Sequence, residues 1–355
     1  MAQAAAVASD RLTAKDYLNK VLAGTATGVV VALIANAILS EIFKFLTTYN
    51  EIFQSMLDVV VVMQFIAPVI IGVLVGMQFA LNPMQCTLIG AAAFLGSGAY
   101  VVQDGVVSMV GIGDLINIML ICALAAFVTR LIGNKLGSLT ILLLPIIVGA
   151  GVGFVGLLAL PYVRLITVGI GNMINSFTNL QPFVMSILIC ISFAILIISP
   201  ISTVAIGIAI GVAGLGAGAA AVGVTACTAI LVIGSMKVNE KGVTLAILLG
   251  AMKMMIPNLI KYPILAVPVI LNAIISGLGV YFFNILGTPA SAGFGIVGLV
   301  GPISAFNNAT GGTGLAIVGV LMAFFVIPFV AGFFIDLLCR KVLHLYDNEI
   351  FKFIQ

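Results

Sequence analysis

Long apolar runs with almost no charged residues constrain this chain more than any other feature. Of its 355 residues, 63% are apolar and 7% are charged, whereas about a quarter of the residues in an average soluble domain are charged. A helix needs about 20 mainly apolar residues to cross the hydrocarbon core of a bilayer. The sequence therefore predicts an all-α, polytopic integral membrane protein and excludes a soluble fold.

Charges and turn residues separate the apolar runs, which predict about ten transmembrane helices. We place these helices at 21–46, 59–80, 84–101, 114–132, 138–160, 182–199, 203–218, 219–236, 262–283 and 313–337. Two further apolar stretches, 242–260 and 287–306, are interrupted by Pro257, Pro289, Pro302 and several glycines. Interrupted backbone is tolerated at membrane depth only inside protein, so both stretches are predicted to be re-entrant hairpins.

The positions of lysine and arginine predict the orientation of the chain. With the N-terminus in the cytoplasm, twelve of the 14 basic residues fall on the cytoplasmic side, and only Lys44 and Arg164 lie near the outer face. This pattern follows the excess of Lys and Arg in cytoplasmic loops. The chain then divides into a cytoplasmic amphipathic segment at 1–20, where Asp10 can cap a short helix, a transmembrane domain at 21–338 and a cytoplasmic tail at 339–355.

Two similar phrases indicate a possible internal repeat. Leu81–Cys86 and Ile198–Thr203 each follow an apolar run, contain a proline and precede a helix rich in Gly and Ala, at an offset of 117 residues. Four spans separate equivalent points, so the two copies would have the same orientation and form a parallel repeat. The alternative is chance similarity, since apolar sequence of low complexity matches itself easily.

Composition argues against several functional classes. A net charge of +3 leaves no basic stripe for nucleic acid. The five cysteines lie in or at the end of apolar runs without a CxxC pair, which is typical of inert thiols. His344 is the only histidine, so the sequence predicts no metal site, no cofactor and no catalytic residue in this chain.

The first candidate for a solute site is a polar segment beside the first predicted hairpin. Asn239 and Glu240 precede this hairpin, and Asn258 lies within it. A carboxylate accepts hydrogen bonds from sugar hydroxyls, and an amide both donates and accepts them. The alternative is a solvated cytoplasmic loop whose lysines set the topology.

A second candidate follows the other hairpin. Asn307, Asn308 and Thr310 form a polar, uncharged segment flanked by glycine. Unwound backbone together with Asn and Thr side chains would offer a neutral surface to a polyol. The alternative is an external turn before the last span.

A third candidate consists of paired helix breaks. Asn82 and Gln85 lie at one break, and Ser199 and Thr203 lie at the matching break of the repeat. In transporters, interrupted helices at corresponding positions of two repeats point to the substrate site. The alternative is that both are simple loops between spans.

Three phrases carry a resemblance to a known family. Lys237–Gly242, Gly293–Gly298 and Pro302–Gly312, set among glycine-rich spans, resemble the enzyme IIC membrane subunits of bacterial sugar phosphotransferase systems. More narrowly, the chain resembles the divergent branch that includes the membrane regulator of perfringolysin O production. The resemblance implies a homodimer in the bacterial cytoplasmic membrane, with sugar bound between spans and hairpins, Glu240 at the sugar, and phosphorylation by a separate IIB-type phosphoryl-carrier protein.

Two functional hypotheses follow. The first is a permease of the phosphotransferase type that binds and translocates a sugar or similar small polar solute by moving one helical unit against another. The second is a membrane-embedded sensor or regulator that binds such a solute without net transport. The lack of a histidine within the predicted spans favours the second, because the better-known permeases place one at the sugar.

Overall fold

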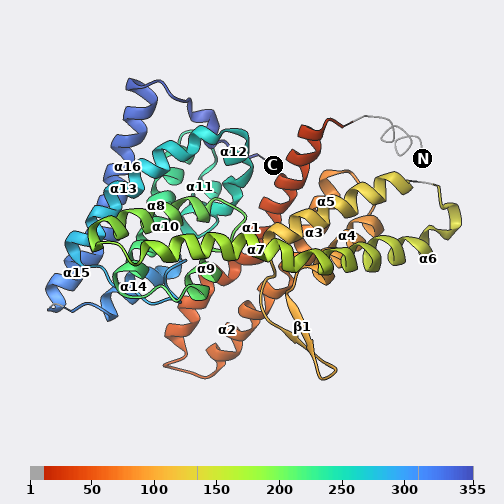
Figure 1. The fold of residues 1–355 in the computed structure, drawn as a ribbon, viewed down its shortest axis with the longest axis horizontal. Coiled ribbons are helices and arrows are strands. Elements are labelled where there is room, and N and C mark those ends of the chain that lie inside the picture. The colour runs from red at the N-terminus through yellow and green to blue at the C-terminus, as the bar shows by residue number, and fades with distance from the viewer. Residues whose placement is uncertain (1–11, 134, 311, 355) are drawn as a thin grey trace. The chain divides into compact units, whose positions relative to one another are not determined.

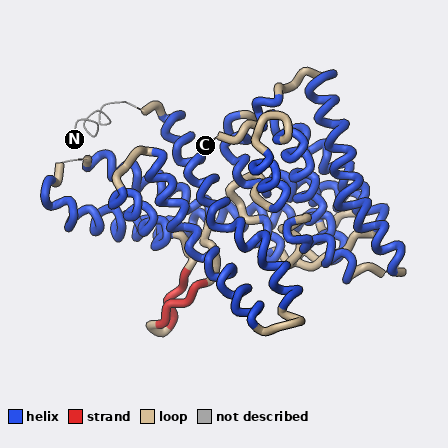
Figure 2. The backbone as a smooth tube through the Cα atoms, turned by 180° about the vertical axis from the view of Figure 1, so that it is seen from behind, coloured by secondary structure: helices blue, strands red, loops and turns tan. Residues whose placement is uncertain are grey.

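The computed structural model describes residues 12–133, 135–310 and 312–354. The described chain is almost entirely helical, with one short antiparallel β-hairpin (Figure 2). It divides into two compact units, of which unit 1 contains the residues up to Leu33 and Val59–Arg164. Unit 2 contains Ile34–Asp58 and Leu165–Ile354. The all-α prediction is confirmed.

Unit 1 is built from helices in the first half of the chain (Figure 1). Helices α1, α2 and α7 run from one unit into the other. The elements are α1 (Ala14–Leu46), α2 (Ile52–Met63), η2 (Gln64–Ile66), α3 (Ala67–Gln78), α4 (Pro83–Gly96), β1 (Tyr100–Gln103), β2 (Val106–Met109), α5 (Leu115–Ile132), η3 (Gly137–Leu139), α6 (Thr140–Leu144), η4 (Pro145–Val152) and α7 (Gly153–Phe177).

Helix α1 begins within the segment predicted to be a separate amphipathic helix. The Thr13 hydroxyl accepts a hydrogen bond from the Asp16 amide at 3.1 Å, which caps the helix. The predicted capping residue, Asp10, lies outside the described residues. From Ala14 the helix continues through position 20 to Leu46, so the structure has no helix end at the predicted boundary between the N-terminal segment and the first span.

Small residues let the helices of unit 1 approach closely. A Cβ atom added to Gly24 would lie 2.5 Å from the Val75 Cα, and one added to Gly72 would lie 2.6 Å from the Gly90 Cα. The buried Asn117 side chain of α5 donates hydrogen bonds to the carbonyls of Gly96 at 2.7 Å and Gly156 at 2.9 Å. This amide therefore ties α5 to both α4 and α7.

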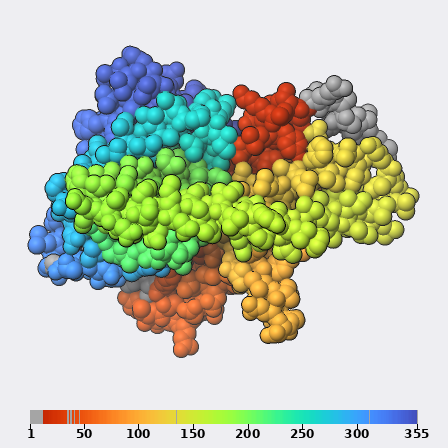
Figure 3. Space-filling view, in the orientation of Figure 1, coloured from red at the N-terminus to blue at the C-terminus, as the bar shows by residue number. Residues whose placement is uncertain are grey.

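The β-hairpin was not predicted. Its strands pair from Tyr100 opposite Met109 to Gln103 opposite Val106, and Asp104 and Gly105 form the turn with φ values of 50° and 78°. Two consecutive residues with positive φ match the twist of the flanking strands. The hairpin projects from the surface of its unit (Figure 3).

Unit 2 holds the second half of the chain. Its further elements are α8 (Pro182–Ile197), α9 (Thr203–Ala209), α10 (Gly214–Ser235), α11 (Lys241–Leu249), η5 (Met252–Met255), α12 (Ile256–Lys261), η6 (Pro263–Leu265), α13 (Ala266–Phe283), η7 (Val297–Leu299), α14 (Val300–Asn307), α15 (Thr313–Leu321), η8 (Met322–Val326), α16 (Ile327–Leu337), η9 (Leu338–Val342) and η10 (Asn348–Phe351).

Helix α10 is the centre of unit 2. Nearly all of its residues are buried, and it packs against α8, α13 and α16. A Cβ added to Gly223 would lie 2.2 Å from the Cys190 carbonyl oxygen on α8. Asn272 of α13 donates to the carbonyls of Ala226 at 2.8 Å and Pro328 at 3.0 Å, which joins α13 to α10 and α16.

Six helices of the described chain are long and apolar enough to cross a membrane, and a seventh is added if the bent pair α11–α12 is one span. These six are Ile52–Gln78, Leu115–Ile132, Gly137–Phe177, Gly214–Ser235, Pro263–Phe283 and Thr313–Val342. The predicted boundary at 218/219 falls inside α10. The chain breaks earlier instead, at Gly211 and Gly214, whose φ values of 64° and 58° are incompatible with a continuous helix.

Candidate functional site at the helix breaks of unit 2

The first predicted hairpin contains a sharp bend. The chain bends by 119° between α11 (Lys241–Leu249) and the helical segment Met252–Lys261, and it turns at Gly250, whose φ is 133°. Such a φ is accessible to glycine and strained for other residues. Pro257 lies in the first turn of α12, where proline is tolerated. Glycine rather than proline therefore produces the interruption.

A second interruption separates α8 from α9. Pro200 lies between them, the Ser199 hydroxyl donates to the Leu196 carbonyl at 2.7 Å, and the Ser202 hydroxyl caps α9 by accepting from the Ala205 amide at 3.2 Å. Proline cannot donate a backbone hydrogen bond. The carbonyls at the end of α8 are consequently left for partners outside the helix.

Lys253 joins these two interruptions. It lies in η5, directly after the bend, and its Nζ donates to the carbonyl oxygens of Ser199 and Ile201, each at 2.8 Å. The side chain is half-buried. These two carbonyls lie just beyond the C-terminal end of α8, where a cation is favourable because a helix carries partial negative charge at that end.

The glycine-rich phrase of the second predicted hairpin packs against the same region. The buried Thr203 hydroxyl donates to the Gly293 carbonyl at 2.9 Å. A Cβ on Gly293 would lie 2.4 Å from the Val204 amide nitrogen. Non-helical chain between α13 and α14 thus lies directly against the start of α9, so three interrupted segments meet within one unit.

The structure places the other predicted residues in different settings. Asn82 and Gln85 form a reciprocal capping box at the start of α4 in unit 1, with hydrogen bonds of 2.9 and 3.1 Å. Glu240 is exposed at the start of α11 and makes no capping bond with its side chain. Asn307 is exposed at the end of α14.

Asn308 and Thr310 follow α14 and are also exposed. The Asn308 amide donates to the Ser304 carbonyl at 2.8 Å, and the Thr310 hydroxyl accepts from the Asn284 amide at 3.4 Å. Of the ten predicted solute contacts, Ser199 and Thr203 lie at the break between α8 and α9, where the interrupted segments meet.

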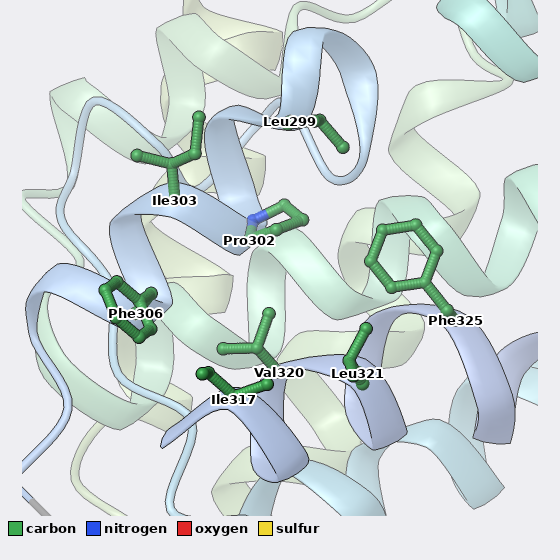
Figure 4. A pocket seen from close by; sticks show the side chains of 8 residues that line it. All are labelled: Leu299, Pro302, Ile303, Phe306, Ile317, Val320, Leu321 and Phe325. Carbon is green, nitrogen blue, oxygen red and sulfur yellow. The ribbon is translucent and has the colours of Figure 1, made fainter. Parts of the chain in front are cut away.

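An apolar groove lies beside the second hairpin (Figure 4). It has a volume of about 270 Å³ and is lined by Leu299, Pro302, Ile303, Phe306, Ile317, Val320, Leu321 and Phe325. No side chain in this lining offers a hydrogen-bond donor or acceptor. The groove does not suit a sugar, although the polar residues of the same phrase follow it in sequence.

The family model described as Phosphotransferase system, EIIC matches residues 19–353. The chain belongs to this family. Comparison with curated proteins and with solved structures gives no match. Family membership and the apolar helices together identify a multi-pass bacterial membrane protein of the sugar-permease type.

Asn239 and Asn258 of this EIIC chain hold its C-terminal segment. The Asn258 amide donates to the carbonyls of Ile350 and Lys352, both at 2.8 Å. The Asn239 amide donates to the Phe351 carbonyl at 2.6 Å, and its Oδ1 accepts from the Phe353 amide at 2.8 Å. Both side chains are thus engaged with backbone more than ninety residues away.

A buried ionic cluster lies near the same segment, and the sequence did not predict it. The Asp336 carboxylate of α16 is 1% exposed, pairs with Lys237, and lies 3.5 Å from an Arg340 nitrogen. The Tyr346 hydroxyl donates to it at 3.3 Å. Burial, reinforced by the nearby carboxylate, raises the pKa of Tyr346 above its ordinary value, so the phenol stays protonated as a donor.

Replacing Asn258 is expected to release the C-terminal segment. Asn258→Leu removes two amide-to-carbonyl hydrogen bonds, each worth about 0.5–1.5 kcal/mol, so the detached state becomes roughly five- to a hundredfold more populated. Trypsin should then cleave after Lys352 correspondingly faster, as followed by intact-mass spectrometry. Asn308→Leu is the control, because that amide bonds only within its own turn; equal cleavage rates in both variants would contradict the contact.

Proposed function

We propose that this chain is the membrane permease subunit of a sugar phosphotransferase system, and that it binds its solute at the helix breaks of unit 2. The observation that carries the proposal is the meeting of three interrupted segments around Lys253 and Thr203. Interrupted helices expose backbone donors and acceptors inside a membrane protein, which is how transporters form polar sites at membrane depth.

The proposed site uses mostly backbone and hydroxyl groups. Ser199 and Thr203 lie at its edge, and the exposed Glu240, Asn307, Asn308 and Thr310 would meet the solute as it enters or leaves. Translocation would occur by movement of one unit relative to the other. A separate IIB-type protein would supply the phosphoryl group at the cytoplasmic face, and the chain would function as a homodimer in the bacterial inner membrane with both termini cytoplasmic.

Uptake of a labelled panel of sugars and polyols, in cells with and without this protein, tests the proposal. We expect protein-dependent accumulation and recovery of the solute in phosphorylated form. Accumulation of unmodified solute would support a permease but would contradict its coupling to phosphorylation.

A sensor is the second candidate function, and one contact favours it. Asn258 belongs to the same hairpin as Lys253 and binds the backbone of the C-terminal segment directly. A solute that shifts the hairpin would therefore change the exposure of this segment to a cytoplasmic regulator. Binding of a solute by the purified protein without any uptake in cells would favour this function over the permease.

A further inference from the structure

We propose that the site at the helix breaks selects an anionic sugar, with Lys253 supplying the cation that recognises its acidic group. This inference rests on the proposed function, since it names the class of solute that the same site would take.

The charges of the C-terminal half are unbalanced. Residues 165–354 contain seven lysines and arginines and four carboxylates. Asp336 is engaged by Lys237, Arg340 and Tyr346. The remaining three acids, Glu240, Asp347 and Glu349, are exposed at helix ends or in the C-terminal segment. None of the described carboxylates forms an ion pair with Lys253.

The described residues that interact with Lys253 do so through neutral groups. Its two acceptors are the carbonyls of Ser199 and Ile201, and the titratable side chain with which it interacts is the buried Cys227 thiol of α10. An ammonium group has three N–H donors, and no described residue accepts the third. The residue keeps part of its surface exposed, and the proposal places the bound molecule at this third donor.

A charged group within a membrane protein that lacks a partner is costly, and such groups mark substrate pathways. Backbone carbonyls compensate part of the charge of Lys253 by their dipoles, but they cannot neutralise it. A carboxylate or phosphate on the solute would do so, with a charge-assisted hydrogen bond to the free N–H. The hydroxyls of the solute would then meet the exposed backbone of the breaks.

A neutral sugar lacks this compensation. A hydrogen bond to a charged group contributes about 1.5–3 kcal/mol, which corresponds to about a ten- to a hundredfold difference in affinity. We therefore expect the protein to bind glucuronate more tightly than glucose, and gluconate more tightly than sorbitol, by that factor. Each pair differs only by a carboxylate in place of a neutral carbon group, so the comparison isolates the charge.

The experiment measures binding of these four compounds, and of glucose 6-phosphate, to the purified full-length protein, together with uptake of the same compounds in cells. Preference for both acids would identify a carboxylate as the recognised group, whereas preference for glucose 6-phosphate alone would identify a phosphate. In Lys253→Met the preference should disappear, and in Lys253→Arg it should persist because the positive charge remains. Lys261→Met, an exposed lysine of the same hairpin, should retain the preference.

The outcomes separate this inference from the proposed function. Equal affinity for acid and neutral members in the unaltered protein would overturn the inference, and this reading does not depend on whether any variant folds. Binding or uptake of neutral sugars alone would overturn it too, while leaving the permease intact. If none of the compounds bound or accumulated, both this inference and the proposed function would be contradicted. An unchanged preference in a Lys253→Met protein of normal melting temperature would exclude Lys253 as the recognising group.

Discussion

Gly223→Ala is expected to prevent α8 and α10 from packing and to leave little folded protein. The added Cβ would lie 2.2 Å from the Cys190 carbonyl oxygen and 2.9 Å from its carbon. Both are backbone atoms, so no side-chain rotation relieves the overlap and the helices must separate. Extra methylenes in well-packed cores usually cost about 1–3 kcal/mol, and we expect a loss of at least about 3 kcal/mol here, because backbone has to move.

Yield of monodisperse protein and melting temperature in detergent measure this effect. Gly242→Ala and Gly314→Ala are the matched controls, because both glycines lie in helices and an added Cβ meets nothing within 4 Å. Alanine is a better helix former than glycine, so these variants should melt at or above the temperature of the unaltered protein. If the Gly223→Ala protein had the same melting temperature as the controls, α8 and α10 would not cross at Cys190.

Much of the fold could be predicted because a helix that crosses a bilayer needs a sufficient length of apolar residues. Apolar length alone places helices at 114–132, 262–283 and 313–337, close to those observed. The positions of helix breaks are harder to predict, because glycine occurs both where helices pack closely and where the chain reverses. The sequence alone does not distinguish these two roles. Gly218 and Gly223 pack inside α10, whereas Gly211 and Gly214 end a helix with positive φ. This ambiguity put the predicted boundary at 218/219.

The β-hairpin could have been found from a signal that is present. An Asp-Gly pair at 104–105 stands between two runs of β-branched residues, which is a strong local mark of a tight hairpin turn. The apolar character of those runs instead extended the predicted third span to position 101. Hydropathy does not distinguish an apolar strand end from a helix end, whereas the residues of the turn do.

The candidate site was predictable only in part. The proline phrases located the break at Ser199 and Thr203, because a helix that meets proline must leave carbonyls free. Lys253 belongs to the polar cluster at the first predicted hairpin, but the sequence does not reveal its partners, since these lie more than fifty residues earlier and are backbone atoms that every residue carries. Asn239 and Asn258 were predicted as solute contacts, but their amide groups bond to the C-terminal backbone.

Lys237→Met combined with Arg340→Met is expected to give the second large effect. Among the residues that the structure describes, the double substitution leaves the Asp336 carboxylate, 1% exposed, with no cation and with only the Tyr346 hydroxyl as donor. Removing the partner of a buried charge costs about 3–5 kcal/mol, because the remaining charge is left desolvated. The melting temperature in detergent should fall sharply. Lys352→Met, which breaks the exposed 3.8 Å pair with Glu349, should cost no more than about 1 kcal/mol.

Adding Asp336→Asn to the double variant tests the cause of that loss. If destabilisation comes from an unpaired buried charge, the neutral amide should recover most of the melting temperature, although one more native residue has been replaced. If it came from lost packing of the Lys237 and Arg340 stems, the third substitution would lower stability further. A recovered melting temperature in the triple variant would thus show that the two cations stabilise the protein by neutralising the carboxylate. A further loss of melting temperature would show that their stems stabilise it by packing.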